Sequence, residues 1–301
     1  MKNDFIFTIK NYKHLDLKDQ TKEIKYLDFA IKKNSYLGLL QVDNDGFFAN
    51  FFRIINKEES FKKINYSYIT ENNNFTFKKN FTIGKQVYLN LLLNFKFSKD
   101  LAYKNLVDFY TMINWNIGTS YHYKHVKEIK KNELIKLAIL KASILEKELI
   151  ILENIDKNLN ANEILDLKLF INSFHNKLTI LIISSNIAWL SSIVDECIVI
   201  FDNRIVEGGD IKEIIEDPYH PITWEVVLKS QDLIYDKFFS YFKDLKYDFN
   251  KKLFDFNKNY ILNIELLLKP IRKEIKENHF VYSWLYSDLN LTQFIKPKIN
   301  Q

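Results

Sequence analysis

The chain has 301 residues, 47% of them hydrophobic, so it can bury the core of one large domain or of a domain with an appendage. Its formal charge is +5, but the basic residues are nearly all lysines spread along the chain, and arginine occurs only at Arg53, Arg204 and Arg272. A nucleic-acid-binding surface favours clustered arginine, so the composition argues against nucleic acid as a partner.

Cysteine usage and hydropathy narrow the class of protein further. Cys197 is the single cysteine, which excludes a disulfide framework and any site built from several cysteines. Because it opens an apolar run, we interpret it as an inert core residue and not as a nucleophile. The N-terminal residues lack the apolar stretch of a secretory signal, and the most apolar segment (179–201) is interrupted by Asn186, Asp195 and Glu196. We therefore expect a cytoplasmic protein without a transmembrane span.

Short apolar runs and helical periodicity alternate along the chain. The apolar runs predict strands buried on both faces, at 36–40, 148–153, 178–184 and 197–201. Apolar residues repeat at three- and four-residue spacing in "NELIKLAILKASILEK" and "ANEILDLKLFINSFHNK", which predicts a helix in each. The alternation indicates an α/β fold with a central parallel sheet.

Two regions depart from this alternation. Residues from about 87 to 135 are more helical, and we expect an inserted helical subdomain there. After residue 230 lysines alternate with aromatic residues, and we expect a small β-rich appendage. Its lysines are interpreted as snorkelling over a packed face, with stacking on nucleic acid as the less favoured alternative.

Two of the four prolines flank a histidine in "EDPYHPITWEVVLKS", residues 216–230. Pro218 and Pro221 lack an N–H and push the preceding residue into an extended conformation, so no helix can run through 217–221. The segment therefore predicts a stiff connector between one helix at Ile211–Glu216 and another at Thr223–Ser230.

The amino-acid sequence of this connector and of the residues just before it resembles that of a known protein family. "NRIVEGGDIKEIIEDPYHPITWEVVLKS" (203–230) resembles the end of the nucleotide-binding domain in oligopeptide/dipeptide-permease ATP-binding subunits of the ABC transporter family. Ile222 replaces an aromatic residue of the family pattern. Further resemblances follow in family order, in "LDFAIKKNSYLGLL" (27–40), "FTIGKQV" (81–87), "YKHVKEIKKNELIKLAILKA" (123–142), "ELIILENIDKNLN" (148–160), "ILIISSNI" (180–187) and "ENHFVYSWLYSD" (277–288).

The resemblance implies a P-loop NTPase-like ABC nucleotide-binding domain in residues 1–230. Such a domain has a central, mostly parallel sheet, an antiparallel β subdomain and an inserted helical subdomain. Residues 231–301 would then be a C-terminal extension of the oligopeptide-permease type. The family's extension normally carries cysteines for an iron–sulfur cluster. Ser283 stands at the last of these positions and the others are also lost, so we expect no cluster.

The phosphate-binding loop of the family, G-x-x-x-x-G-K-[ST], falls on "QVDNDGFFAN". That loop surrounds phosphates with backbone N–H groups, while its lysine contacts the β- and γ-phosphates and its Ser/Thr contacts Mg²⁺. Here Phe47 stands at the lysine position, and Asp43 adds negative charge that opposes phosphate binding. The degenerate loop positions are Gln41, Asp45, Gly46, Phe47, Phe48 and Ala49. Binding of ATP and Mg²⁺ at this loop is therefore disfavoured, and Gly46 is better explained as an ordinary turn glycine.

The other catalytic positions implied by the family are also altered. Glu153 stands where an aspartate supports Mg²⁺, and Asn154 replaces the glutamate that polarises the attacking water. Ser185 replaces the switch histidine, Glu71 the Q-loop glutamine and Asn160 the D-loop aspartate.

The signature sequence L-S-G-G-x falls on Lys127, Glu128, Ile129, Lys130 and Lys131. Side chains at the glycine positions should block the approach of a helix N-terminus to the γ-phosphate, although Lys130 or Lys131 can supply positive charge instead. His122 and His125 have the spacing of metal ligands but no acidic or cysteine partners nearby, so we expect no metal site there.

Three functions remain open on this sequence. The first is a catalytically degenerate ATP-binding subunit of a peptide ABC importer. It would lie on the inner face of the cell membrane, docked on transmembrane permease subunits and on a second ABC ATPase in a heterodimer. The second is a scaffold or binding protein that keeps the fold without a transport role. The third is an active ATPase with unorthodox residues.

Overall fold

The computed structural model describes residues 4–14, 24–42, 63–70, 77–78, 80–111, 123–201, 204–230 and 272–282. The chain divides into two compact units that interleave along the sequence. The first consists of Met1–Ile6, Ile31–Tyr36 and Lys62–Ile182, and the second of Phe7–Ala30, Leu37–Phe61 and Ile183–Gln301. The expected boundary at residue 230 stays a prediction.

The strands form an eight-stranded sheet in the order β4-β5-β6-β3-β7-β8-β10-β9, and β1 and β2 form a two-stranded sheet. Pairing is parallel for β4 with β5 and for β3 with β7, and antiparallel for β7 with β8, β8 with β10 and β10 with β9. The strands are β1 (Phe5–His14), β2 (Ile24–Lys32), β3 (Tyr36–Gln41), β4 (Tyr66–Thr70), β5 (Leu149–Glu153), β6 (Ile180–Ser184), β7 (Glu196–Phe201), β8 (Arg204–Asp210), β9 (Arg272–Lys276) and β10 (His279–Tyr282). The mixed α/β architecture with its mostly parallel centre confirms the predicted fold class.

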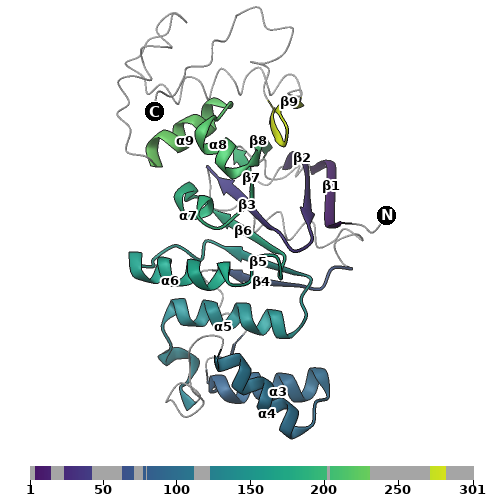
Figure 1. Ribbon diagram of the computed structural model, residues 1–301, viewed down its shortest axis with the longest axis vertical. Helices are drawn as coiled ribbons and strands as arrows, with labels where there is room; N and C mark the ends of the chain where they lie inside the picture. The colour runs from purple at the N-terminus through teal and green to yellow at the C-terminus, as the bar shows by residue number, and fades with distance from the viewer. Residues whose placement is uncertain are drawn as a thin grey trace, which may run out of the picture. The chain divides into compact units, whose positions relative to one another are not determined.

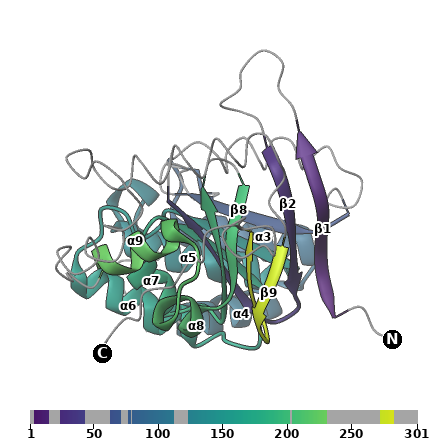
Figure 2. The same ribbon diagram turned by 90° about the horizontal axis from the view of Figure 1, so that it is seen from above.

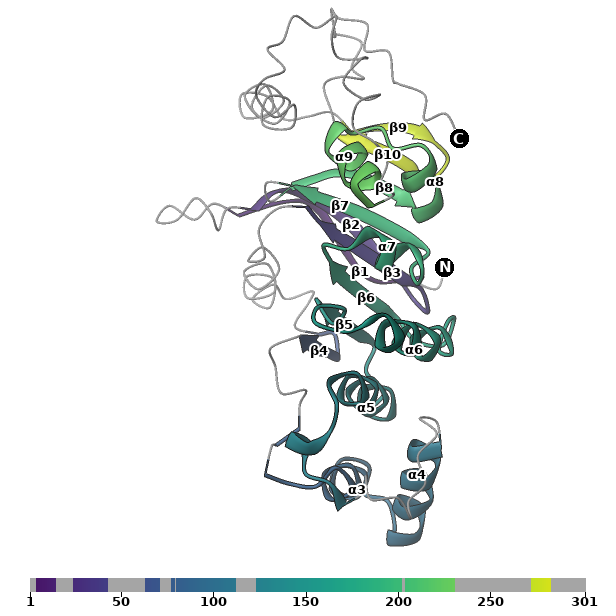
Figure 3. The same cartoon turned by 90° about the vertical axis from the view of Figure 1, so that its left-hand side faces the viewer.

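The first unit contains four α-helices of twelve or more residues and one short 3-10 helix among its described residues. They are α3 (Ile83–Phe95), α4 (Lys99–Thr111), the 3-10 helix η3 (Val126–Glu128), α5 (Lys131–Ile144) and α6 (Ala161–Asn172). Figure 3 shows α3 and α4 as neighbouring helices. Helix α3 begins before the stretch expected to be helical, and α4 lies within it. Strand β5 is buried at every position, as its continuous apolar run predicts. As a separate subdomain, residues 87–135 stay a prediction.

The second unit holds β3, β7 and β8 with the short helices α7 (Ile187–Ser191), α8 (Ile211–Glu216) and α9 (Pro221–Ser230). Figure 1 shows α8 and α9 beside β8. Helix α9 begins at Pro221, two residues before the predicted start at Thr223. A proline fits the first helical position because a backbone N–H there would have no intrahelical acceptor, so its loss costs no hydrogen bond.

Strands β1 and β2 lie side by side and run in opposite directions (Figure 2). Their buried Phe7 and Phe29 rings pack edge to face with centroids 6.3 Å apart. This arrangement agrees with the antiparallel β element that the resemblance implies.

Cys197 lies in β7 and is fully buried, and this burial raises the pKa of its thiol to about 12. The thiolate therefore does not form at neutral pH, which agrees with an inert core residue. Among the helices within the described ranges, none is long and apolar enough to cross a membrane.

Candidate functional site

The first predicted phosphate-loop position, Gln41, is the last residue of β3 and is buried. The remaining loop positions, the Q-loop position and one histidine lie outside the described residues. They are Asp43, Asp45, Gly46, Phe47, Phe48, Ala49, Glu71 and His122.

Glu153, which the resemblance predicts to stand at the metal-supporting position, is the last residue of β5. Its side chain is only 7% exposed, and it accepts a hydrogen bond from the hydroxyl of Tyr68 on the neighbouring strand β4. The parallel register sets Thr70 opposite Glu153 and Tyr68 opposite Ile151, so the phenol lies two residues before the carboxylate along the strand direction. The retained acid is therefore held inside the sheet by a tyrosine.

The protonation of Tyr68 fixes which group donates. Burial, followed by the hydrogen bond to Glu153, raises the pKa of the Tyr68 phenol above its ordinary value. Tyr68 therefore stays protonated at neutral pH and donates to the Glu153 carboxylate.

These residues do not fit a magnesium ion. Mg²⁺ keeps several waters and binds through exposed carboxylate oxygens and substrate phosphates. Glu153 is buried and bonded to a phenol, and the next residue, Asn154, carries an amide in place of a carboxylate. Within the described ranges, no group of three or more His, Cys, Asp or Glu side chains is arranged to hold a metal ion.

Residues 154–160 form a turn that leads from β5 into α6. Asn154 has a φ of 51°, in the left-handed region that asparagine tolerates better than most residues. Asn160, at the predicted D-loop position, caps α6: its Oδ1 accepts from Glu163 N at 3.0 Å, and the Glu163 carboxylate accepts from Asn160 N at 3.0 Å. An amide cannot act as the general base at position 154, and Asn160 is engaged in holding its own helix.

Ser185, at the predicted switch-histidine position, is exposed and follows β6. The next residue, Asn186, caps α7 by accepting from Trp189 N at 3.1 Å, so the strand-to-helix turn is kept. A serine hydroxyl does not titrate near neutral pH, so it cannot replace the imidazole as an acid or base.

The predicted signature positions, Lys127 to Lys131, surround the start of α5. Lys127 and Glu128 are exposed on η3, where the Glu128 carboxylate accepts from His125 N at 3.2 Å. Ile129, at a glycine position, is buried. Lys130 precedes the helix without a side-chain cap and is exposed.

Lys131 is the first residue of α5, and its Nζ donates to the carbonyl oxygen of Lys157 at 2.6 Å. This bond ties the signature position to the turn that follows β5 in the same chain. Of the two lysines proposed to supply charge in place of the signature glycines, Lys131 is thus engaged internally, while Lys130 is exposed.

Replacing Tyr68 with phenylalanine is expected to lower the free energy of unfolding by about 1–3 kcal/mol, because the buried Glu153 carboxylate loses its hydroxyl donor. Urea denaturation measures this change. Tyr103→Phe on α4, where the side chain is exposed, is the matched control and should have no effect beyond error. Adding Glu153→Gln to Tyr68→Phe should recover part of the loss, since the buried charge is then removed. Equal stability of Tyr68→Phe and the native chain would contradict this assignment.

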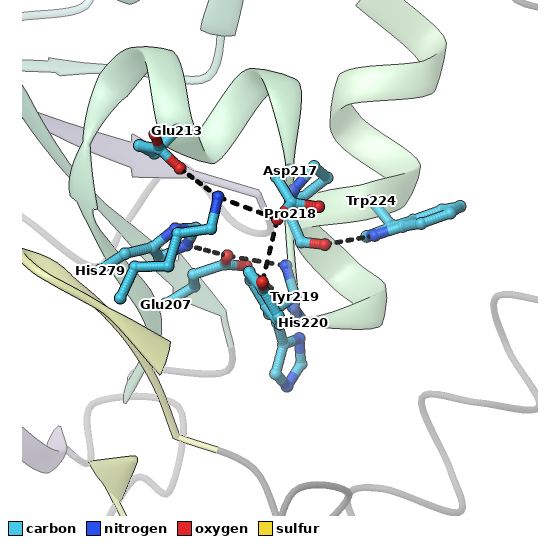
Figure 4. A network of polar contacts seen from close by, with 9 residues as sticks. Glu207, Glu213, Asp217, Pro218, Tyr219, His220, Trp224 and His279 are labelled. Carbon is cyan, nitrogen blue, oxygen red and sulfur yellow. Dashed lines mark hydrogen bonds and ion pairs between the residues drawn. The ribbon is translucent and has the colours of Figure 1, made fainter. Parts of the chain in front are cut away.

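The connector on which the resemblance rests is organised by one buried carboxylate (Figure 4). Glu207 of β8 accepts from Tyr219 N at 2.8 Å, from His220 N at 2.9 Å and from His279 Nε2 of β10 at 2.6 Å. Trp224 Nε1 donates to the carbonyl oxygen of Pro218 at 2.5 Å, which closes the turn over α9.

His220 has a local role inside this turn. Its Nδ1 accepts from Ile222 N at 3.2 Å, and the side chain is 1% exposed. Burial, followed by the positive charge of Arg204, lowers the pKa of His220 to about 3. The imidazole is therefore neutral at physiological pH and supports the first turn of α9.

Sequence reasoning missed three contacts: Tyr68 with Glu153, Lys131 with the Lys157 carbonyl, and Glu207 with His279. The first two carry no sequence signature. The third had a signal, because both residues fall in segments that resemble the family, "RIVEGG" and "NHFVY".

The chain resembles known proteins in part of its sequence and in its fold. No protein-family model matches it. The oligopeptide transport ATP-binding protein AmiE, from two strains of Streptococcus pneumoniae, is 29% identical over 140 residues, which cover 44% of this chain and 38% of that protein.

The solved structure of CbiO1 from Clostridium perfringens, part of the ABC transporter complex CbiONQ, superposes with a TM-score of 0.61. It is 13% identical in sequence, and the superposition covers 78% of this chain and 98% of CbiO1, a likeness that shows the fold. Part of the chain is therefore homologous to an oligopeptide transport ATP-binding protein, and the chain shares the fold of CbiO1, part of an ABC transporter complex.

Proposed function

We propose that this chain is a catalytically degenerate ATP-binding-cassette subunit of an oligopeptide-type ABC importer. It docks on transmembrane permease subunits at the inner face of the cell membrane and pairs with a second ABC ATPase that carries the intact catalytic residues. The observation that carries the proposal is the state of Glu153, the one acid kept at a metal-supporting position. It is buried and bonded to Tyr68, and it is followed by an amide.

The loss of chemistry together with the retention of the fold supports docking as the remaining role. Helices α3 and α4 expose apolar side chains, among them Leu93 at 73%, Leu101 and Tyr103. Exposed apolar groups on neighbouring helices are typical of an interaction surface. We assign this surface to the permease, because the family resemblance places the permease contact in the helical region.

The proposal makes no use of ATP or Mg²⁺ at the chain's own phosphate loop, although the family binds both. It also excludes an iron–sulfur cluster, because Cys197 is the single cysteine and lies buried in β7. Nucleotide is bound instead by the partner ATPase.

The purified chain is expected to release no phosphate from Mg·ATP above the level of a Glu153→Gln variant. Asn154 removes the group that polarises water and Ser185 removes the switch imidazole. A coupled phosphate-release assay on both proteins, prepared in parallel, measures this. Magnesium-dependent turnover that is present in the native chain and absent in Glu153→Gln would show an active ATPase with unorthodox residues.

A second measurement separates the transporter subunit from a scaffold without a transport role. Co-expression with the permease and ATPase genes that neighbour its own gene, followed by affinity purification through this chain, should recover the membrane subunits in a stable complex. Recovery of the chain without them, from cells in which the permease assembles with the other ATPase, would favour the scaffold. The transport role would then be abandoned.

A further inference from the structure

Glu207 joins segments that are far apart in the sequence. Its carboxylate is fully buried, and it accepts from two backbone amides in the turn 217–221 and from the imidazole of His279, 72 residues away. Figure 4 shows the three donors converging on the carboxylate from the turn and from β10. Both ends of the undescribed stretch 231–271 therefore lead to this one side chain.

The hairpin of β9 and β10 is built to approach β8 closely. His279 pairs with Gly209, Phe280 with Gly208 and Val281 with Glu207 itself. A Cβ at Gly209 would lie 2.2 Å from the carbonyl oxygen of Asn278, so any side chain there would displace the backbone of the hairpin. Gly209 is thus needed for His279 to reach Glu207.

Two further contacts join the hairpin to the turn. Lys276 Nζ lies 2.6 Å from a Glu213 oxygen and 3.2 Å from an Asp217 oxygen, at the exposed rim. The Tyr219 ring packs edge to face on the His279 ring with centroids 5.1 Å apart. The rim ion pairs are solvated and contribute little, so the buried carboxylate is the main connection.

A buried carboxylate is stable only when its donors are all in place. Removing one partner of a buried charge leaves the remaining charge poorly compensated, and the penalty falls on every element that holds it. The donors from the turn and from the hairpin therefore support one another. Because such coupling is reciprocal, unseating the hairpin must also loosen the turn.

We propose that Glu207 is a positioning residue that couples the seating of the C-terminal hairpin to the order of the turn 217–221 and the start of α9. The β9–β10 hairpin is then part of the same cooperative unit as the turn and not an independent appendage. While the hairpin is paired with β8, the turn 217–221 is ordered, and displacing the hairpin from β8 loosens the turn. This inference stands on the geometry of the second unit and does not depend on the transport role.

Amide hydrogen exchange of the full chain tests the coupling, because the turn contains very few exchangeable amides. Pro218 and Pro221 have no N–H, so within 218–221 only Tyr219 and His220 exchange, and both amides donate to Glu207. In His279→Ala we expect these two amides to exchange at least about tenfold faster, the effect of weakening a hydrogen bond to a charged group. His279→Gln should restore protection, because its side-chain amide nitrogen can donate where Nε2 does.

Two further variants keep the test decisive. Gly209→Ala unseats the hairpin sterically while every polar group of the network is kept, and it should accelerate the same two amides. Lys276→Gln, in the same hairpin but at the exposed rim, is the matched control and should leave them unchanged. The proposal is overturned if His279→Ala and Gly209→Ala accelerate exchange in the hairpin but leave Tyr219 and His220 as protected as in the native chain.

Discussion

Lowering the pH from 7 to 4 is expected to reduce the free energy of unfolding by about 3 kcal/mol through His220 alone. Burial and the charge of Arg204 lower the pKa of His220 to about 3, against 6.5 for an exposed histidine. Between these two values the unfolded chain binds a proton that the folded chain does not. Acid therefore favours unfolding. This stabilising effect is complete above pH 6.5 and is lost progressively as the pH falls toward 3.

Chemical denaturation at a series of pH values measures this dependence, and His220→Asn isolates the contribution of His220. The asparagine Oδ1 can accept from Ile222 N as Nδ1 does, and it does not titrate. The variant should lose less stability than the native chain between pH 7 and pH 4, by about 3 kcal/mol. The carboxylates of the chain titrate in both proteins, so their contributions to the free energy of unfolding cancel in the comparison. Parallel pH profiles of the two proteins would show that His220 is protonated in the folded state.

The central strands of the sheet could be predicted from the sequence because a short, continuously apolar run is stable only where both of its faces are buried. A run such as "LIILE" cannot leave either face in water, so it becomes a strand covered on both sides, and β5, β6 and β7 all lie in the predicted places. Two prolines likewise required a connector between α8 and α9. The start of α9 at Pro221 differed from the prediction because a proline can begin a helix as well as interrupt one.

The contacts that define the candidate site could not be predicted from the sequence. Tyr68 meets Glu153 only because β4 and β5 pair in a particular parallel register, and β4 has no continuous apolar run that would fix this register in advance. The bond from Lys131 to a backbone carbonyl uses an acceptor that every residue possesses. A motif comparison can identify the position of a catalytic residue. It cannot identify the neighbouring side chain or backbone group that forms a hydrogen bond with that residue.

These contacts limit what this chain can contribute to the partner ATPase that we propose. ABC ATPases pair head to tail, so each nucleotide lies between the phosphate loop of one subunit and the signature of the other, as the family resemblance implies. The signature positions here present a buried Ile129 at a glycine position, and Lys131 is tied to the Lys157 carbonyl. Lys130 is exposed just before α5, and we expect it, and not Lys131, to face a phosphate held by the proposed partner.

A mixed complex of this chain with an intact partner is therefore expected to bind ATP at the partner's phosphate loop and to hydrolyse it about 100- to 1,000-fold more slowly than a homodimer of the partner. Loss of one phosphate-stabilising element raises the barrier by about 3–4 kcal/mol, which corresponds to that range. Single-turnover measurements on the assembled complex determine both quantities. Lys130→Ala should reduce the residual rate further. Lys131→Ala is the matched control and should change it less, because its ammonium group is already bonded within the chain. A mixed complex that hydrolyses ATP at the homodimer rate, and is indifferent to Lys130→Ala, would mean that this chain completes the partner's site by other residues.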